Sequence, residues 1–278
     1  MTEPTVADTT AWWSTGVTRI APGEISLRGY PVQELIGQVD FVSTIWLMVR
    51  GELPDPRQAR LLETALVASV DHGPQAPSIA SARMAITCGV GINSAMANGI
   101  NTLGDVHGGA GQQCVALLTE MRATVARESR EVDDVAAQAV ADHRARRAFV
   151  PGFGHRFHPV DPRRDVILAH VERAVADGLI GGEYLVLGRA LERQLAAGAG
   201  RAVPMNIDGI SAIVYAELGF EPELARGLFV LARSVGILAH AWEERNTGRR
   251  IKGPLPPPLL ADYTGPTDRP LAGIGDAP

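Results

Sequence analysis

Five apolar residues late in the chain recur at alternating spacings of four and three. They are Leu224, Leu228, Leu231, Val235 and Leu238. An α-helix has about 3.6 residues per turn, so residues at these spacings lie along one side of it. The pattern predicts a long amphipathic helix, which we expect to be buried.

Other long segments without proline also read as helices. Residues 20–30, which Pro-Gly and Arg-Gly pairs interrupt, are the best strand candidate and predict a small hairpin. Aromatic residues make up only 5% of the chain. We therefore predict an all-α fold with a small N-terminal β-hairpin at most. The predicted helices cover residues 57–70, 78–98, 108–127, 131–147, 163–177 and 183–197.

Charge and composition exclude several classes of protein. The 278 residues carry a net charge of −5, whereas nucleic-acid-binding proteins usually have a basic surface. Cys88 and Cys114 have neither metal-ligand nor disulfide spacing, so we expect no metal site. The first ten residues are polar and acidic, and no run of about 18 apolar residues occurs. We expect a cytoplasmic protein that binds neither nucleic acid nor membrane.

The segment 151–156, PGFGHR, is the strongest chemical signal, and Asp-Pro-Arg follows at 161–163. Gly152 and Gly154 allow the backbone to approach a ligand, and His155 can exchange a proton near neutral pH. Arg156 and Arg163 can each hold a carboxylate through paired hydrogen bonds. The segment suits binding of a polycarboxylate with proton transfer. Taken alone, it is equally well explained as a loop between helices with solvated charges.

Four more residues stand in short motifs. His72 lies in Asp-His-Gly-Pro, His107 in Gly-Asp-Val-His-Gly-Gly, and Asp208 in Asn-Ile-Asp-Gly. Arg233 falls in the late amphipathic helix. Each has an ordinary alternative: a lone histidine is more often a cap or a core residue, Asp208 an N-cap, and Arg233 a snorkelling surface residue.

Together these motifs resemble the citrate synthase family. His-Gly-Gly, Pro-Gly-Phe-Gly-His with Asp-Pro-Arg, Asn-Ile-Asp, and an arginine helix ending in Gly-Ile-Leu-Ala-His occur here in the family's order. The resemblance covers roughly residues 15–250. It implies a two-domain helical fold, in which residues 1–114 and 201–278 form a large domain and residues 115–200 a small one.

The chain departs from the family in the length of one segment. Only residues 55–70 separate the Gly-Glu-Leu-Pro segment from the Asp-His motif, where full-length synthases have a longer helical stretch. This short form is similar to the citryl-CoA lyase module of ATP-citrate lyase, although that module lacks a histidine at the position of His107. The segment between His155 and Asp161 is also one residue shorter than in much of the family. The family's late Arg-Pro motif is replaced by Arg-Arg-Ile-Lys-Gly-Pro at residues 249–254.

The resemblance implies a role for each candidate residue. Asp208 exchanges a proton with the carbon next to a thioester, His107 stabilises the enol, and His155, beside His72, polarises the ketone. Gly152 and Gly154 belong to the coenzyme A site. A coenzyme A thioester is then a substrate, with no permanently bound cofactor. The implied carboxylate ligands are Arg163, Arg233 and Arg156.

The leading hypothesis is an enzyme that cleaves citryl-CoA to acetyl-CoA and oxaloacetate. The alternatives are a small synthase that condenses an acyl-CoA with oxaloacetate or another 2-oxo acid, and a non-catalytic relative that binds a ligand. We also expect a homodimer in which the small-residue helix at 78–98 packs across the interface. The Pro-rich segment from Gly253 is predicted to be either an extended tail that reaches a partner subunit or a disordered tail.

Overall fold

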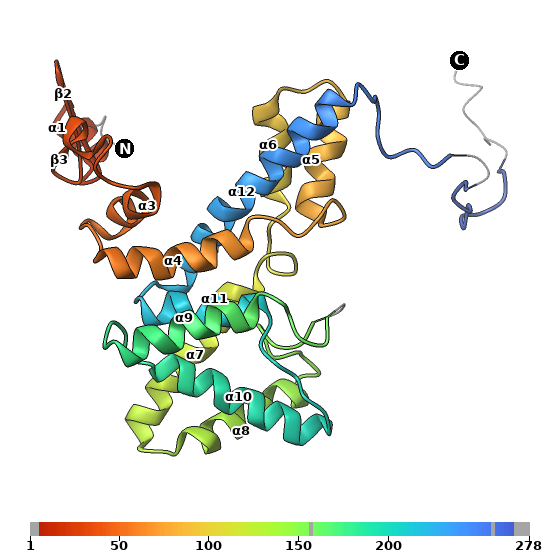
Figure 1. The fold of residues 1–278 in the computed structure, drawn as a ribbon. Helices are drawn as coiled ribbons and strands as arrows, with labels where there is room; N and C mark the ends of the chain where they lie inside the picture. The colour runs from red at the N-terminus through yellow and green to blue at the C-terminus, as the bar shows by residue number, and fades with distance from the viewer. Residues whose placement is uncertain (1–5, 156–157, 257–258, 270–278) are drawn as a thin grey trace, which may run out of the picture.

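The computed structural model describes residues 6–155, 158–256 and 259–269, and helices dominate these residues (Figure 1). The predicted all-α fold is confirmed. The helices are α1 (Val6–Trp12), α2 (Val32–Leu35), α3 (Phe41–Arg50), α4 (Pro56–Ser69), α5 (Pro77–Thr87), α6 (Ile92–Asn101), α7 (Ala110–Glu128), α8 (Val132–Ala145), α9 (Arg164–Ala176), α10 (Glu183–Ala199), α11 (Ile207–Glu217) and α12 (Pro222–Asn246).

The N-terminal strands form a slightly larger sheet than the predicted hairpin. β1 (Thr18–Ala21), β2 (Glu24–Leu27) and β3 (Tyr30–Pro31) make an antiparallel sheet in the order β1-β2-β3. Gly23 and Gly29 form the two turns with positive φ, which costs glycine little. The sheet and α1 stand at one end of the molecule, beyond α3 (Figure 1).

The single helix predicted over residues 78–98 was wrong, because the chain forms two helices there. Cys88 ends α5, Gly89 takes a left-handed φ of 90°, and Gly91 begins α6. The two helices pack against each other and against α12. Small side chains permit this close packing, as expected. The buried residues of this group are Ala76, Ile79, Ala82, Ile86, Ala95, Ile237 and Ala241.

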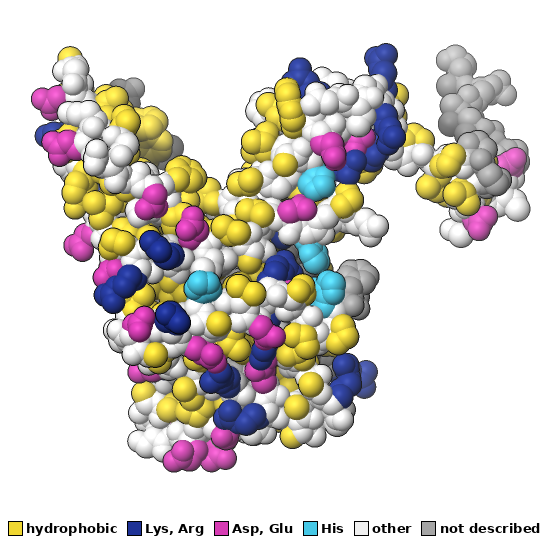
Figure 2. Space-filling view, in the orientation of Figure 1, with side chains coloured by type: hydrophobic (Ala, Val, Ile, Leu, Met, Phe, Trp, Pro, Cys, Tyr) yellow, Lys and Arg dark blue, Asp and Glu magenta, His cyan; other side chains and the backbone are white. Residues whose placement is uncertain are grey.

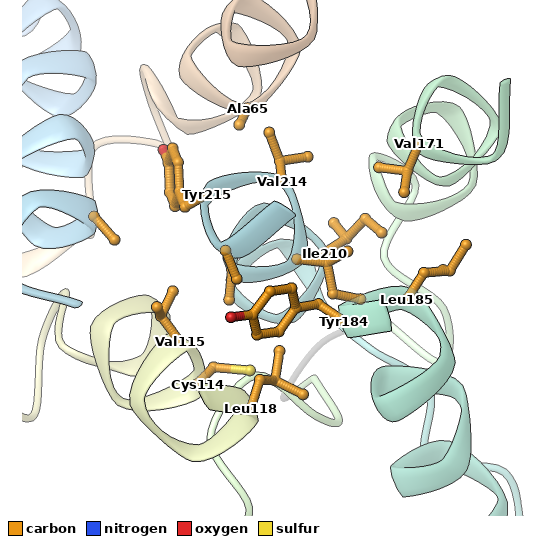
Figure 3. Packing of buried hydrophobic residues seen from close by; sticks show 14 of the residues in the cluster. Ala65, Cys114, Val115, Leu118, Val171, Tyr184, Leu185, Ile210, Val214 and Tyr215 are labelled. Carbon is orange, nitrogen blue, oxygen red and sulfur yellow. The ribbon is translucent and has the colours of Figure 1, made fainter. Parts of the chain in front are cut away.

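The larger core surrounds α11. Figure 3 shows Ile210 and Val214 of this helix among side chains from α4, α7, α9 and α10. Every residue from 209 to 216 is buried. A helix packed on all sides holds its first turn in a fixed position, and that turn contains Asp208.

The apolar stripe of α12 only partly faces the core, which corrects the expectation that it is buried. Leu228 is 1% exposed, but Leu231, Val235 and Leu238 are 49%, 57% and 43% exposed. By length and composition α12 could cross a membrane, yet here it lies along α5 and α6. Besides Leu228, its buried residues are mostly small and include two charged side chains: Ala225, Ala232, Arg233, Gly236, Ile237, Ala241 and Glu244.

The predicted domain division stays a prediction. Residue 114 lies inside α7, and residue 200 follows the end of α10. The described part of the C-terminal segment, residues 253–256 and 259–269, contains neither helix nor strand. In Figure 1 this segment extends away from the helices.

Candidate active site

Six of the predicted site residues surround one cavity of about 130 Å³. Figure 2 shows histidine and basic side chains gathered in a recess near the middle of the molecule. Arg156 lies outside the described residues. The cavity is lined by Ser69, His72, His107, Gly108, His155, Arg163, Asn206, Ile207, Asp208, Phe229 and Arg233.

Two segments far apart in sequence pair to place His155 beside the start of α11. The backbone N–H of Gly154 donates to the carbonyl of Pro204 at 2.8 Å, and that of Asn206 donates to Gly152 at 3.0 Å. The Asn206 side chain donates to the Gly154 carbonyl at 2.6 Å. This short antiparallel bridge makes the histidine loop and the first turn of α11 one unit.

The two glycines of the predicted coenzyme A loop have different surroundings. A β-carbon on Gly152 would lie 2.7 Å from the Cα of Gly209 and 2.9 Å from the Cys114 sulfur, so close packing requires this glycine. Gly154 lines a second cavity, of about 300 Å³, which lies next to the first. His155 lines both cavities.

Asp208 is not the N-cap of its helix. Asn206 caps α11, because its side-chain oxygen accepts from the backbone N–H groups of Asp208 and Gly209. Among the described residues, no hydrogen bond involves the Asp208 carboxylate. Burial raises the pKa of Asp208, although the charges of Arg163 and Arg233 oppose that rise. The carboxyl group is thus available for proton exchange inside the cavity.

A backbone hydrogen bond fixes the tautomer of His107. The N–H of Ser78, in the first turn of α5, donates to His107 Nε2 at 3.1 Å, and the Ser78 hydroxyl lies 3.0 Å from the same nitrogen. Nε2 must therefore be unprotonated, and a neutral His107 carries its proton on Nδ1. Burial and the charge of Arg233 lower the pKa of His107. This histidine is built to donate a hydrogen bond while neutral.

His72 and His155 form a perpendicular pair with ring centroids 5.8 Å apart. The backbone N–H of His158 donates to His155 Nδ1 at 3.0 Å, so a neutral His155 carries its proton on Nε2. Burial lowers the pKa of both rings, and the charge of Arg163 lowers both further. No hydrogen bond within the described part of the chain involves the His72 ring.

Arg233 is buried, which overturns the snorkelling alternative. It is 5% exposed, its Nε donates to the Ser69 carbonyl at 3.0 Å, and its guanidinium lies 5.0 Å from the Phe229 ring centre. No carboxylate within the described residues forms an ion pair with it. Burial lowers the pKa of Arg233. A buried cation without a counter-ion is costly, and a carboxylate ligand would compensate it.

Arg163 is held in place by Asp161. Its Nε and Nη2 donate to the two Asp161 oxygens at 2.9 and 2.8 Å, and Nη1 donates to the Ala68 carbonyl at 3.1 Å. Burial alone would raise the pKa of Asp161, but its hydrogen bonds to Arg163 outweigh that effect and lower the pKa to about 2. Three of the five N–H groups of Arg163 are used, so two remain for a ligand.

Sequence reasoning missed Ser78, Asp161 and Asn206 as residues that position the site. Asp161 and Asn206 stood within recognised motifs, so their position was a usable signal. Ser78 has no such signal, because it contacts His107 from 29 residues away. No group of three or more histidine, cysteine or acidic residues among the described residues could hold a metal ion.

The family model for the C-terminal domain of citrate synthase matches residues 48–254. The chain belongs to the citrate synthase family. It is 29% identical over 228 residues to a citrate synthase of Acidithiobacillus ferridurans and 30% identical over 245 residues to one of Haloferax volcanii. These matches cover 80% and 87% of this chain but only 54% and 59% of the relatives, so the chain spans little more than half their length.

Solved structures of the family share this fold. The citryl-CoA lyase of Hydrogenobacter thermophilus is similar with a TM-score of 0.82 and 29% identity, and the match covers 93% of this chain and 97% of that one. A citrate synthase of Thermoplasma acidophilum, solved with carboxymethyl coenzyme A and oxaloacetate, gives a TM-score of 0.69 at 22% identity. That match covers 85% of this chain and 60% of the other. The predicted family resemblance is confirmed.

Proposed function

We propose that this protein cleaves citryl-CoA to acetyl-CoA and oxaloacetate. The observation that carries the proposal is Arg233, a buried guanidinium with which no carboxylate of the described residues pairs, in the same cavity as His107 and Asp208. The similarity to a citryl-CoA lyase over nearly its whole length supports the choice of reaction. Arg163 and Arg233 hold the carboxylates of the citryl group, and Arg156 is proposed as a third ligand.

In the proposed cleavage, His155 Nε2–H donates a hydrogen bond to the tertiary oxygen, and His72, which its lowered pKa keeps neutral, accepts the hydroxyl proton. The carbon–carbon bond then breaks, and its electron pair forms the enolate of the thioester while the oxygen-bearing carbon becomes the ketone. His107 Nδ1–H donates to the enolate oxygen. The protonated carboxyl of Asp208 gives its proton to the enolate carbon. His72 then loses its proton to solvent, and Asp208 takes one up from solvent, which restores both groups.

The raised pKa of Asp208 suits this direction, because a carboxyl group must be protonated to act as an acid. The general acid and base groups each contribute about 10²–10⁴-fold to the rate. Fixed arginine ligands add the advantage of orientation.

The thioester would lie in the first cavity, where His107 and Asp208 act on it, and the rest of coenzyme A would extend into the second cavity, beside His155. This cavity is lined by Gly154, His158 and Arg201, among others. A third cavity, of about 440 Å³, shares Arg201 and adds Arg144 and Arg147. We assign the phosphates of coenzyme A to these arginines, because guanidinium groups bind phosphate through paired hydrogen bonds.

The second candidate is condensation of an acyl-CoA with oxaloacetate. The curated relatives favour it, because they are named citrate synthases. The same residues serve both directions, since Asp208 without its proton is a base for the thioester carbon. A non-catalytic relative is the third candidate, and a cavity that retains His107, His155 and Asp208 weighs against it.

Product analysis distinguishes these candidates. The protein is incubated with citryl-CoA, and separately with acetyl-CoA plus oxaloacetate, while oxaloacetate, thioester and free thiol are followed. A lyase forms oxaloacetate and acetyl-CoA without releasing thiol, whereas a synthase releases thiol because it hydrolyses citryl-CoA to citrate. The D208N variant serves as the control. No turnover in either mixture would refute both enzymatic candidates.

We also propose a homodimer, in which α12 and the α5–α6 pair meet their counterparts in a second copy. The exposed stripe of α12 supports it, together with Trp242 and Met84, which are 52% and 46% exposed. An apolar face of this kind is typical of a subunit interface. A cytoplasmic location remains part of the proposal.

A further inference from the structure

Two neighbouring cavities lie between α4 and α9, apart from the cavities assigned above. Their volumes are about 300 and 470 Å³, and they share Arg60 and His170. Ligand pockets usually measure about 300–1,000 Å³, so each is large enough to hold part of a small molecule. We name the pair the α4–α9 groove.

One end of the α4–α9 groove is basic. Arg57, Arg60 and Arg173 line it, with Asp177 as the acidic member. Arg57 already forms an ion pair with Asp55 at 3.0 Å and also interacts electrostatically with Asp177. Within the described residues, neither Arg60 nor Arg173 has a side-chain hydrogen bond or ion pair. Both side chains are exposed, so these two guanidinium groups are free to pair with a ligand.

Figure 2 shows the same arrangement on the surface. Basic side chains gather around a histidine where α4 and α9 lie side by side in Figure 1. Arg57 lies in the first turn of α4, where the helix dipole disfavours a cation and favours an anion. This placement is unfavourable for folding and favourable for binding an anion.

The other end of the groove is mostly apolar. Val67 and Val166 are each 62% exposed there, beside Ile167 and Pro162, and Glu63 is the acidic residue of this end. Val67 follows Arg60 by seven residues on α4, which corresponds to about 10 Å along a helix. The groove thus has a basic head and an apolar extension of the length of a medium alkyl chain.

We propose that the α4–α9 groove binds an organic phosphate monoester with an apolar body. The phosphate dianion would pair with Arg60 and Arg173, and the apolar body would cover Val67 and Val166. Two exposed guanidinium charges match a dianionic phosphate better than a single carboxylate. The proposal does not depend on the reaction catalysed.

Arg163 connects this groove to the candidate active site. It lines both the apolar end of the groove and the cavity of His107 and Asp208. Its Nη1 donates to the Ala68 carbonyl, on the helix that forms the groove. A ligand in the groove would therefore contact a residue that we assign to carboxylate binding. Any coupling between the two sites must act equally in both directions.

Titration calorimetry at pH 8 tests the site with octyl phosphate, octanoate, octanol and inorganic phosphate. We expect octyl phosphate to bind at least tenfold more tightly than each of the others. R60A/R173A should weaken octyl phosphate binding at least tenfold. R122A/R127A removes the same charge from α7 and should change it less than twofold. Tightest binding of octanoate would overturn the phosphate assignment, and equal loss in both double variants would reduce the effect to net charge.

A second variant tests the apolar end. Val166 is exposed, so V166E should leave the fold intact while it places a carboxylate beside the alkyl chain. We expect at least threefold weaker binding of octyl phosphate, with the affinity for inorganic phosphate changed less. If octyl phosphate instead binds through the active site, R233L will abolish its binding and R60A/R173A will not, which would overturn the proposal whichever reaction the enzyme catalyses.

Discussion

The Cα atom of Gly209 lies where a β-carbon on Gly152 would approach it to 2.7 Å. A β-carbon on Gly209 would in turn overlap the carbonyl oxygen of Gly152. Two backbone segments can approach this closely only when both residues lack side chains. The contact brings the loop of His155 against the first turn of α11, so the positions of His155 and Asp208 depend on it.

Alanine at Gly209 should destabilise the protein by about 1–3 kcal/mol, since overpacking a close contact displaces the backbone. Gly227 in α12 is the matched control, because its added β-carbon would meet nothing within 4 Å. G227A should be neutral or should raise stability by up to about 1 kcal/mol, as expected for a helical glycine. Urea denaturation measures both values. Equal effects in the two variants would contradict the packing role of Gly209.

Replacement of Asp208 by asparagine should lower the turnover rate about 10²–10⁴-fold, while dicarboxylate binding persists. The amide keeps the shape of the side chain but cannot exchange the proton. Since Asn206 caps α11 and burial raises the pKa of Asp208, the neutral amide should not lower the stability of the protein at neutral pH. Single-turnover kinetics and oxaloacetate titration measure the two effects. Wild-type turnover in the variant would assign Asp208 a structural role.

R233L should weaken binding of oxaloacetate or citrate by about 2–5 kcal/mol, because one ligand carboxylate loses its partner in a buried site. The fold should survive, since leucine suits a position that is 5% exposed. R245L on the same helix is the control, because Arg245 is exposed and its guanidinium lies over the Trp242 ring. Unchanged affinity in R233L would remove Arg233 from the binding site.

The contribution of Asp161 to the stability of the fold should be lost at acid pH. Its pKa in the folded protein is about 2, below the ordinary 3.8, so the ionised carboxylate stabilises the fold. At about 1.4 kcal/mol per pKa unit, the contribution is about 2 kcal/mol. It is complete above about pH 4 and is lost as the pH falls toward 2.

The D161N variant should therefore be about 2 kcal/mol less stable than the wild type at pH 7, and the difference should shrink between pH 4 and pH 2. Thermal melting across this range measures it. D165N is the comparison, since Asp165 lies on the exposed side of α9. A difference that does not change with pH would show that packing, and not ionisation, is responsible.

An aspartate at Val235 should convert the predicted homodimer to single chains. Val235 is 57% exposed in one chain, and burial of a new charge in an apolar interface is unfavourable. Val186, which is 51% exposed on α10, provides the same substitution elsewhere. Sedimentation at micromolar concentration should show a monomer for V235D and a dimer for V186D. A monomeric wild type would refute the dimer.

The sequence predicted most helices, because their boundaries carry local signals such as Asp55 before Pro56. It failed where the deciding contact is distant or ambiguous. Gly89 could equally have allowed close packing inside one helix or ended that helix. Its positive φ in the structure shows that it ends the helix. The apolar stripe of α12 predicted a helix, but it did not show that much of this stripe is left exposed in a single chain. Arg233 is buried through the carbonyl of Ser69, 164 residues away, which no local pattern reveals.

The place of His155 between two cavities has a kinetic consequence for the proposed cleavage. The dicarboxylate and the thioester carbon would both lie in the first, inner cavity, and the rest of coenzyme A would fill the second cavity, on the path past His155. Product release is then sequential, with acetyl-CoA leaving before oxaloacetate, and accumulated oxaloacetate slows the next turnover by keeping the inner cavity filled.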